Sequence, residues 1–200
     1  NKIWLIVGGI FSALEPLAFL AMALFAVYMY RKGEKSHPNK IALFWTIGAS
    51  IVSFVGAGLL GFAHTLPQTN LYTHGTLVTA MHGHYAFWGA YAMIVLAIIS
   101  YALPNLTGRK RYNNTSGHMA FWLSNVGMLG MTVAFGVAGV AQVYLERKMK
   151  LDFMDVQNEI AIHFVVLLVC ATLFTTGITL FIIEFIKYGK PTDEALVKEE

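Results

Sequence analysis

Apolar residues fill five long stretches of the chain, and polar residues gather in the short connections between them. The stretches run over about 3–30, 41–64, 76–103, 119–144 and 156–186. Each is about 24 to 31 residues long, and about 20 apolar residues are enough for a helix to cross the hydrocarbon core of a bilayer. The pattern predicts an all-α fold, a polytopic transmembrane helical bundle with five membrane-spanning helices in a single membrane domain over residues 1–200.

Positive charges gather in the first and third connections, whereas the second connection, residues 65–75, has no charged residue. The positive residues are Arg31, Lys32, Lys35, Lys40, Arg109, Lys110 and Arg111. Loops rich in Lys and Arg tend to stay on the cytoplasmic side of a membrane. We therefore expect the first and third connections and a tail over 187–200 to be cytoplasmic, with residue 1 and the second and fourth connections on the outer side.

The composition agrees with a membrane protein and narrows the chemistry. Hydrophobic residues make up 56% of the 200 residues and charged residues only 12%, as expected for an integral membrane protein. The net charge of +3 comes from the connections and the tail, and it gives no indication of nucleic-acid binding. Cys170 is the only cysteine, which excludes an intrachain disulfide and a Cys-x-x-Cys-His attachment of haem c. Any haem must then be held by side-chain ligation alone.

Several other residues have a simple structural interpretation. Aromatic residues near the ends of the runs are typical of an interfacial belt; they are Trp4, Trp45, Tyr72, Trp122 and Tyr144. Glycines in the second and fourth runs predict close helix contacts; they are Gly56, Gly58, Gly61, Gly127, Gly130, Gly136 and Gly139. His37 and His118 fall in predicted cytoplasmic loops, where we expect solvated side chains.

Two histidines, His82 and His84, lie near the start of the third apolar run. On a helix, positions i and i+2 are about 200° apart around the axis, so the two side chains leave on opposite sides at nearly one depth. They cannot share one metal, but each can hold a different centre, and Gly83 leaves room for a bulky planar group. Inside a membrane this pattern suggests axial ligation of two haems. The alternative is a pair of hydrogen-bonded packing residues.

The predicted topology places His82 roughly 10 Å from the outer face. Haem propionates would then point toward the uncharged second connection, where Asn70, Tyr72, Thr73 and His74 could donate hydrogen bonds. An ordinary interfacial role for each of these four residues is equally compatible with the sequence. His64, at the end of the second run, could also reach a propionate or a water chain. His163, a lone histidine in the last run, is better explained by packing.

Glu15 is the only acidic residue inside the first three runs. A carboxylate in hydrocarbon is costly unless it is paired, protonated or hydrated, so an intramembrane acid is a functional candidate. Pro16 follows it and favours a kink nearby. The alternative is a structural carboxylic acid that is kept neutral.

Three segments together resemble a known family. They are Phe11–Leu17, the stretch from Gly56–Gly58 to His64–Leu66, and the run from Thr73 to Ile94 with the His82-Gly83-His84 motif. They resemble the large catalytic subunits of cytochrome-c-dependent nitric oxide reductases, in the haem–copper oxidase superfamily. The resemblance covers nearly all 200 residues, as the last five helices of a twelve-helix fold. His-x-His is shared by the whole superfamily, whereas the Ser-Ala-Leu-Glu-Pro segment is the more specific mark.

The resemblance implies a role for each candidate residue. His82 would be the proximal ligand of the high-spin haem b3 and His84 an axial ligand of the low-spin haem b. Glu15 would lie beside the non-haem iron FeB, in proton delivery or in shaping the surroundings of that iron, and Asn70 and His74 would lie near haem propionates. The implied reaction reduces two NO to N2O and water with two electrons and two protons, and the electrons pass through haem b.

The chain also lacks parts that the family has. The family's FeB ligands and the second ligand of haem b lie on earlier helices, and this sequence starts without Met almost directly in an apolar run. We therefore expect it to be the C-terminal part of a longer polypeptide.

The implied partners are the upstream part of the same subunit, a small subunit that carries haem c, and a soluble c-type cytochrome or similar donor. The implied location is the bacterial inner membrane, with the haems toward the periplasm. Two alternatives remain: a fragment of an oxygen-reducing haem–copper oxidase, and a non-enzymatic dihaem electron-transfer or quinol-binding subunit.

Overall fold

The computed structural model describes residues 2–33, 39–108 and 113–188, and all the regular structure in these ranges is helical. Five spans are long and apolar enough to cross a membrane, Ile6–Lys32, Lys40–Thr65, Leu77–Thr107, Asn114–Lys148 and Phe153–Lys187. The predicted all-α bundle with five membrane-spanning helices is confirmed. His37 and the tail beyond residue 188 lie outside the described residues.

Most of the spans consist of more than one helical segment. In chain order the segments are α1 (Lys2–Ser12), α2 (Glu15–Lys32), α3 (Lys40–Ser53), η1 (Phe54–Leu60), α4 (Gly61–Thr65), α5 (Pro67–Thr73), α6 (Leu77–Phe87), η2 (Trp88–Ala92), α7 (Met93–Thr107), α8 (Asn114–Val143), η3 (Tyr144–Lys148) and α9 (Phe153–Tyr188). The three η segments are π-helical, a form that is frequent at functional sites. Two of them, η1 and η2, flank the segments that carry the site described below.

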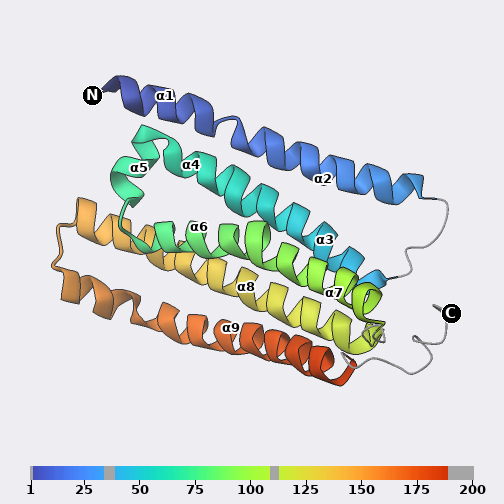
Figure 1. Ribbon diagram of the computed structural model, residues 1–200. Helices are drawn as coiled ribbons and strands as arrows, with labels where there is room; N and C mark the ends of the chain where they lie inside the picture. Colours follow the sequence, from blue (N-terminus) through green and yellow to red (C-terminus); the bar gives the residue numbers. More distant parts are fainter. Residues whose placement is uncertain (1, 34–38, 109–112, 189–200) are drawn as a thin grey trace.

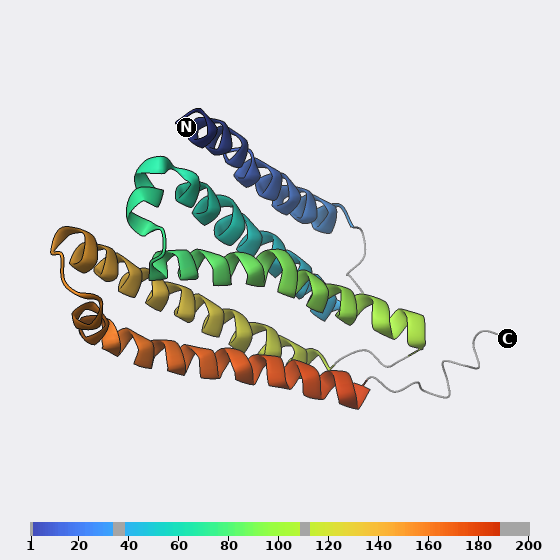
Figure 2. The same ribbon diagram turned by 60° about the vertical axis from the view of Figure 1, so that its left-hand side comes forward.

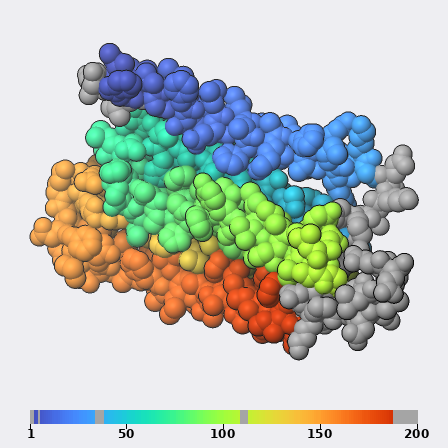
Figure 3. Space-filling model, viewed as in Figure 1, coloured from blue at the N-terminus to red at the C-terminus, as the bar shows by residue number. Residues whose placement is uncertain are grey.

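The spans lie roughly side by side and alternate in direction, from α1 and α2 at one edge to α9 at the other (Figures 1 and 2). The first span forms an edge of the molecule (blue in Figure 3), and none of its most apolar window is buried within this chain. The last two spans pack together most extensively, because α8 and α9 run antiparallel along most of their length. The apolar face of the first span is therefore the least covered part of the bundle.

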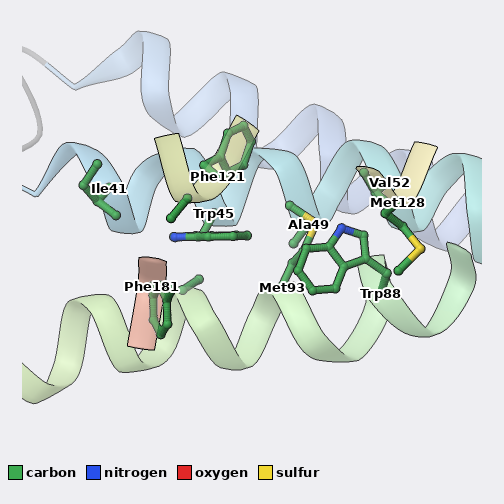
Figure 4. Packing of buried hydrophobic residues seen from close by; sticks show 11 residues of the cluster. Ile41, Trp45, Ala49, Val52, Trp88, Met93, Phe121, Met128 and Phe181 are labelled. Carbon is green, nitrogen blue, oxygen red and sulfur yellow. The ribbon is translucent and has the colours of Figure 1, made fainter. Parts of the chain in front are cut away.

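The core of the bundle is a cluster of aromatic rings around Trp45 of α3, which is 0% exposed. Its ring meets Trp88 of η2, Phe121 of α8 and Phe181 of α9 edge to face, with centroid separations of 6.1, 5.1 and 5.9 Å (Figure 4). Edge-to-face pairs of this kind add to the stabilisation from burying their area. The prediction of an interfacial Trp45 is wrong, because this side chain joins three other spans.

The third span is longer than predicted, because α7 continues through Pro104 to Thr107. Proline has no N–H, so Pro104 cannot donate to the carbonyl of Ser100 one turn earlier. Asn39 supplies the missing donor, since its Nδ2 donates to Ser100 O at 2.7 Å. The same side chain also caps α3, because its Oδ1 accepts from Ala42 N at 3.1 Å. Asn39 thus caps the start of α3 and also allows α7 to continue through Pro104.

The fourth span begins earlier than predicted. Asn113 caps α8, with its Oδ1 accepting from Thr115 N at 2.9 Å. His118 therefore lies in the helix, and its ring packs edge to face on Phe44 at 4.6 Å. The prediction of a solvated His118 in a loop is wrong. The last helix also continues to Tyr188, slightly past the predicted start of the tail.

The first span is broken close to Pro16, as the sequence predicts. Helix α1 ends at Ser12 and α2 begins at Glu15, with a turn over residues 13–14 between them. Pro16 occupies the first turn of α2, where its missing N–H costs nothing. The break places Glu15 at the start of a helix instead of in the middle of one.

The glycines predicted to mark close helix contacts do so. A Cβ on Gly56 would lie 2.8 Å from the backbone of Tyr85, and one on Gly61 would lie 3.3 Å from the ring of His82. Both contacts bring the second span directly against α6. The missing side chains therefore set the distance between the second span and α6 at His82.

Candidate functional site

His82 lies on α6 and points toward the second span. Its Nδ1 is 3.0 Å from the carbonyl oxygen of Gly56 in η1. A carbonyl oxygen can only accept, so Nδ1 carries the hydrogen and Nε2 keeps a free lone pair. This is how proteins fix the tautomer and ring direction of a histidine that binds a metal through its other nitrogen. The π-helical segment thus holds His82 in a form that is able to bind a metal.

Gly61, at the start of α4, lies between His82 and Glu15. The position of a Gly61 Cβ is 3.3 Å from His82 Cε1, 3.9 Å from His82 Nε2 and 3.7 Å from Glu15 Oε2. The imidazole and the carboxyl therefore approach the same point from two helices. The side chain of Glu15 is exposed within this chain, so the prediction of a carboxylate buried in the interior does not hold for these residues alone.

His84 points to the other side of α6. Its Nδ1 is 2.8 Å from the carbonyl oxygen of Ala80, one turn earlier, and its ring stacks on Phe135 of α8 with a centroid separation of 5.0 Å. The hydrogen bond again requires the hydrogen on Nδ1 and leaves Nε2 able to bind a metal. The two histidines thus face different spans, His82 toward η1 and His84 toward α8. This agrees with the opposed directions expected from their spacing.

A large apolar cavity of about 860 Å³ opens beside His84. Its lining comes from α6, η2, α7, α8 and α9 and includes Gly83, Phe87, Trp88, Tyr91 and Met128. Gly83 has open space where a Cβ would point. Trp88 is fixed as one wall, because its Nε1 donates to Asn125 Oδ1 at 3.1 Å. The volume, the apolar lining and a single imidazole at the edge suit a flat apolar cofactor with an axial ligand.

His64, at the end of the second span, supports His82 from the side. The two imidazole rings lie 5.2 Å apart and are tilted by 33°. His64 Nε2 donates to the carbonyl oxygen of Val78 at 3.2 Å, and its Nδ1 is 3.5 Å from Thr73 Oγ1. Since both nitrogens have partners, His64 connects α6 to the second connection through its two ring nitrogens.

Asn70 and His74, the two residues predicted to contact haem propionates, lie on the second connection beside His64. Asn70 Nδ2 donates to the carbonyl oxygen of His64 at 2.9 Å, and the backbone of Asn70 accepts from His74 N at 3.0 Å. The side chain of His74 is exposed at the end of α5. Asn70 therefore has a structural role in this chain, and His74 is free to meet a group on the outer side.

The start of α6 depends on a residue that the sequence reasoning missed, Gln142 of α8. Its Oε1 accepts from Leu77 N at 2.9 Å, and its Nε2 donates to Glu146 Oε1 at 2.8 Å. Thr76 adds a side-chain cap, accepting from Val78 N at 3.3 Å. Gln142 is buried, and its place as a polar residue in an apolar run is the signal in the sequence that could have identified it.

The donor set fits b-type haem better than it fits an ion held by protein ligands alone. Each histidine offers one Nε2 to a separate side of α6, and each Nδ1 is fixed by a backbone carbonyl. Within the described residues, no group of three or more His, Cys, Asp or Glu side chains could hold a metal ion. Single axial ligation to two centres is the chemistry that this arrangement supports.

The chain matches a known protein family over most of its length. Residues 1–173 match the family described as cytochrome C and quinol oxidase polypeptide I. A nitric oxide reductase subunit from Stutzerimonas stutzeri is 42% identical over 196 residues, which cover 94% of this chain and 41% of that protein. The chain therefore spans less than half the length of this relative. It is a member of the cytochrome c and quinol oxidase polypeptide I family, in the haem–copper oxidase superfamily.

Proposed function

We propose that residues 1–200 are a single membrane domain from the catalytic subunit of a nitric oxide reductase. The reaction joins two NO with two electrons and two protons to give N2O and water. The observation that carries the proposal is the pair of histidines on opposite faces of α6, each with Nδ1 bound to a carbonyl and Nε2 available. The 42% identity to a nitric oxide reductase subunit supports this choice of reaction.

Each histidine has its own proposed cofactor. His84 would hold a low-spin haem b in the apolar cavity, and His82 would hold a high-spin haem b3. When bound, the two haems and a non-haem iron, FeB, whose ligands lie outside this stretch, supply the electrons and the metal sites that hold NO. Gly56 fixes the ring of His82, because its carbonyl oxygen accepts from Nδ1. Asn70 and His74, which lie beside His64 on the second connection, would meet haem propionates from the outer side.

Glu15 is the proposed proton-delivering group. Its carboxyl and the ring of His82 both approach Gly61, so it is the acid nearest to the proposed reaction centre among the described residues. A carboxyl can pass a proton to a reacting group and recover it from water. Its exposure within this chain leaves room for the upstream part of the same subunit to cover it.

The proposed setting is the bacterial inner membrane, with the haem end toward the periplasm and the end of α9 toward the cytoplasm. This orientation rests on the positive residues of the first and third connections. The proposed partners are the upstream part of the subunit, a small subunit with haem c, and a soluble c-type cytochrome as donor. Identity to a protein named as a subunit supports an assembly of this kind.

The proposal is tested in the complete enzyme by comparing Glu15→Gln, Glu15→Asp and Glu15→Leu. Gln keeps the shape but cannot relay a proton, so we expect a loss of NO turnover of about 100-fold or more with both haems still bound and reducible. Asp shortens the reach by about 1.5 Å but keeps the carboxyl, and it should retain more activity than Gln. The matched control is Glu159→Gln, an exposed acid on α9, which should leave turnover unchanged. Full activity in Glu15→Gln, or loss of haem, would contradict the role.

Oxygen reduction is the second candidate, because the matched family is named after cytochrome c and quinol oxidases. The two functions differ in the metal that faces the high-spin haem, iron in the first case and copper in the second. Metal analysis of the purified assembly decides between them. We expect iron beyond the haem content and no stoichiometric copper.

A further inference from the structure

A buried acid, Glu184, lies far from His82 and His84, toward the other end of the bundle. Glu184 is 6% exposed and lies about one turn before the end of α9 at Tyr188. Its Oε2 has no hydrogen-bond partner among the described residues. A buried carboxyl without a partner is costly in a protein interior. The site described above does not explain this cost, because α6, which carries His82 and His84, and the start of α2 at Glu15 lie away from the end of α9 (Figure 1).

The position of Glu184 on α9 is one that otherwise holds core residues. Phe174, Gly177, Phe181 and Glu184 follow the three- and four-residue spacing of one helix face. Phe174 meets Trp88, Gly177 lies against Ala120 of α8, and Phe181 meets Trp45. Glu184 continues this face by one turn. Its carboxyl therefore lies on the face of α9 that packs into the bundle, one turn beyond Phe181.

Trp45 presents a second unpartnered polar atom at this place. Its Nε1 is buried and has no hydrogen-bond partner among the described residues, although the residue is 0% exposed. Figure 4 shows this nitrogen on the side of the ring toward Ile41, which is the end of the bundle where Glu184 lies. An indole N–H only donates and a carboxylate only accepts. The two groups have complementary chemistry, and Phe181, which contacts the ring of Trp45, lies one turn before Glu184 on the same face of α9.

A third buried polar atom, Ser100 Oγ of α7, belongs to the same end of the bundle. Ser100 is 0% exposed, its hydroxyl lacks a partner among the described residues, and its carbonyl is tied to Asn39 at the start of α3. Buried polar groups without protein partners are typical of sites for internal water. An indole N–H only donates and cannot ligate a metal ion, whereas water can accept from it and donate to a carboxylate.

The other titratable side chains that the structure describes at this end of the bundle do not form an ion pair with Glu184. Lys40 of α3 and Lys187 of α9 are exposed, and His118 of α8 packs on Phe44 with its Nε2 unpartnered within the described chain. No ion pair to Glu184 is found within the described residues. The exposed turn that follows Glu184 provides a short way to the aqueous phase.

We propose that Glu184 is a proton-exchanging site at the end of the bundle opposite to the histidines. Its carboxyl binds internal water, which joins it to Trp45 Nε1 and to the aqueous phase at that end. The site is separate from Glu15, which lies nearer to the other end of the bundle. The inference does not depend on the reaction at the haems.

The test is hydrogen exchange of the indole N–H groups in the complete enzyme transferred to D2O. Trp45 and Trp88 are a matched pair, 0% and 3% exposed, but Trp88 Nε1 is bonded to Asn125. The signals are assigned with Trp45→Phe and Trp88→Phe in ultraviolet resonance Raman difference spectra. We expect Trp45 to exchange at least about tenfold faster than Trp88, because water reaches only Trp45. Equal or slower exchange at Trp45 would overturn the proposal.

Two variants of Glu184 distinguish its role in binding water from its role in exchanging protons. Glu184→Leu removes the polar side chain and should slow the exchange of Trp45 about tenfold, while Trp88 is unchanged. Glu184→Gln keeps a polar side chain without acid–base chemistry, so exchange should fall between wild type and Leu. Exchange in Glu184→Gln equal to wild type would overturn the proton-exchanging role. If Glu184→Leu does not assemble, the ratio of Trp45 to Trp88 in the wild type still decides whether water is present.

Discussion

The two ends of the bundle are built differently. Around Trp45 the side chains of four spans close on one another, and Trp45 and Met93 are both 0% exposed. Around the histidines the chain is open, with His84 and Glu15 exposed and a cavity of about 860 Å³ between the helices. The packed end is closed mainly by side chains of this chain, although Trp45 and Glu184 keep buried polar atoms without partners among the described residues, whereas the open end leaves a cavity between helices. Packing at one end thus positions α6 for ligands and partners at the other.

The largest effect at the packed end is expected for Trp45→Ala. The substitution removes a fully buried aromatic ring that touches three other spans, so we expect a loss of about 3–5 kcal/mol in the free energy of unfolding. Detergent-titration unfolding of the purified subunit measures it. Trp122→Ala, an exposed residue on the neighbouring span, is the matched control and should be nearly neutral. Equal losses in the two variants would mean that the aromatic cluster is not the stable core.

The hydrophobic pattern was sufficient to predict the spans, because burial in a bilayer requires long apolar runs. It failed at their ends. The third run was predicted to end at about residue 103, but α7 continues through Pro104, because the donor that replaces the proline N–H comes from Asn39, more than sixty residues earlier in the chain. Trp45 was assigned to the membrane surface from its place near a run end, although its partners lie on three other spans. Contacts between distant residues override such local expectations.

The same limit applies to the site. The opposed directions of His82 and His84 follow from helix geometry and were predictable from their spacing. The acceptor for His82, the Gly56 carbonyl, lies on another span and cannot be read from the sequence. Neither can the contact of Gln142 with the start of α6. Glu184 was visible as an acid in an apolar run, but its significance depends on its burial.

A medium effect is expected at the open end from Gln142→Leu. The substitution leaves the N–H of Leu77 without its side-chain acceptor, which should cost about 1–3 kcal/mol. It should also shift the iron–histidine stretching frequency of the His82 haem, since α6 loses its anchor to α8. Gln68→Leu, at an exposed position on α5, is the control. If the two variants have the same stability and the same frequency, Gln142 does not position α6.

The smallest effect is expected for Asn39→Ala, again at the packed end. It removes the cap of α3 and the donor to Ser100, so we expect a loss of about 1 kcal/mol without any change in the haem spectra. Adding Pro104→Ala should recover part of the loss, because the new backbone N–H can donate to the Ser100 carbonyl. If the second substitution gives no recovery, the bond from Asn39 does not replace the one that proline removes.

The central claim is that His82 and His84 hold two different haems on the two sides of α6. It is tested most directly by optical spectra of the complete enzyme with His82→Ala or His84→Ala, reduced and then exposed to carbon monoxide. His84→Ala should remove the low-spin signature and keep the carbon monoxide shift. His82→Ala should disturb the carbon-monoxide-binding haem and keep the low-spin signature. Either variant with both spectra intact would contradict the assignment.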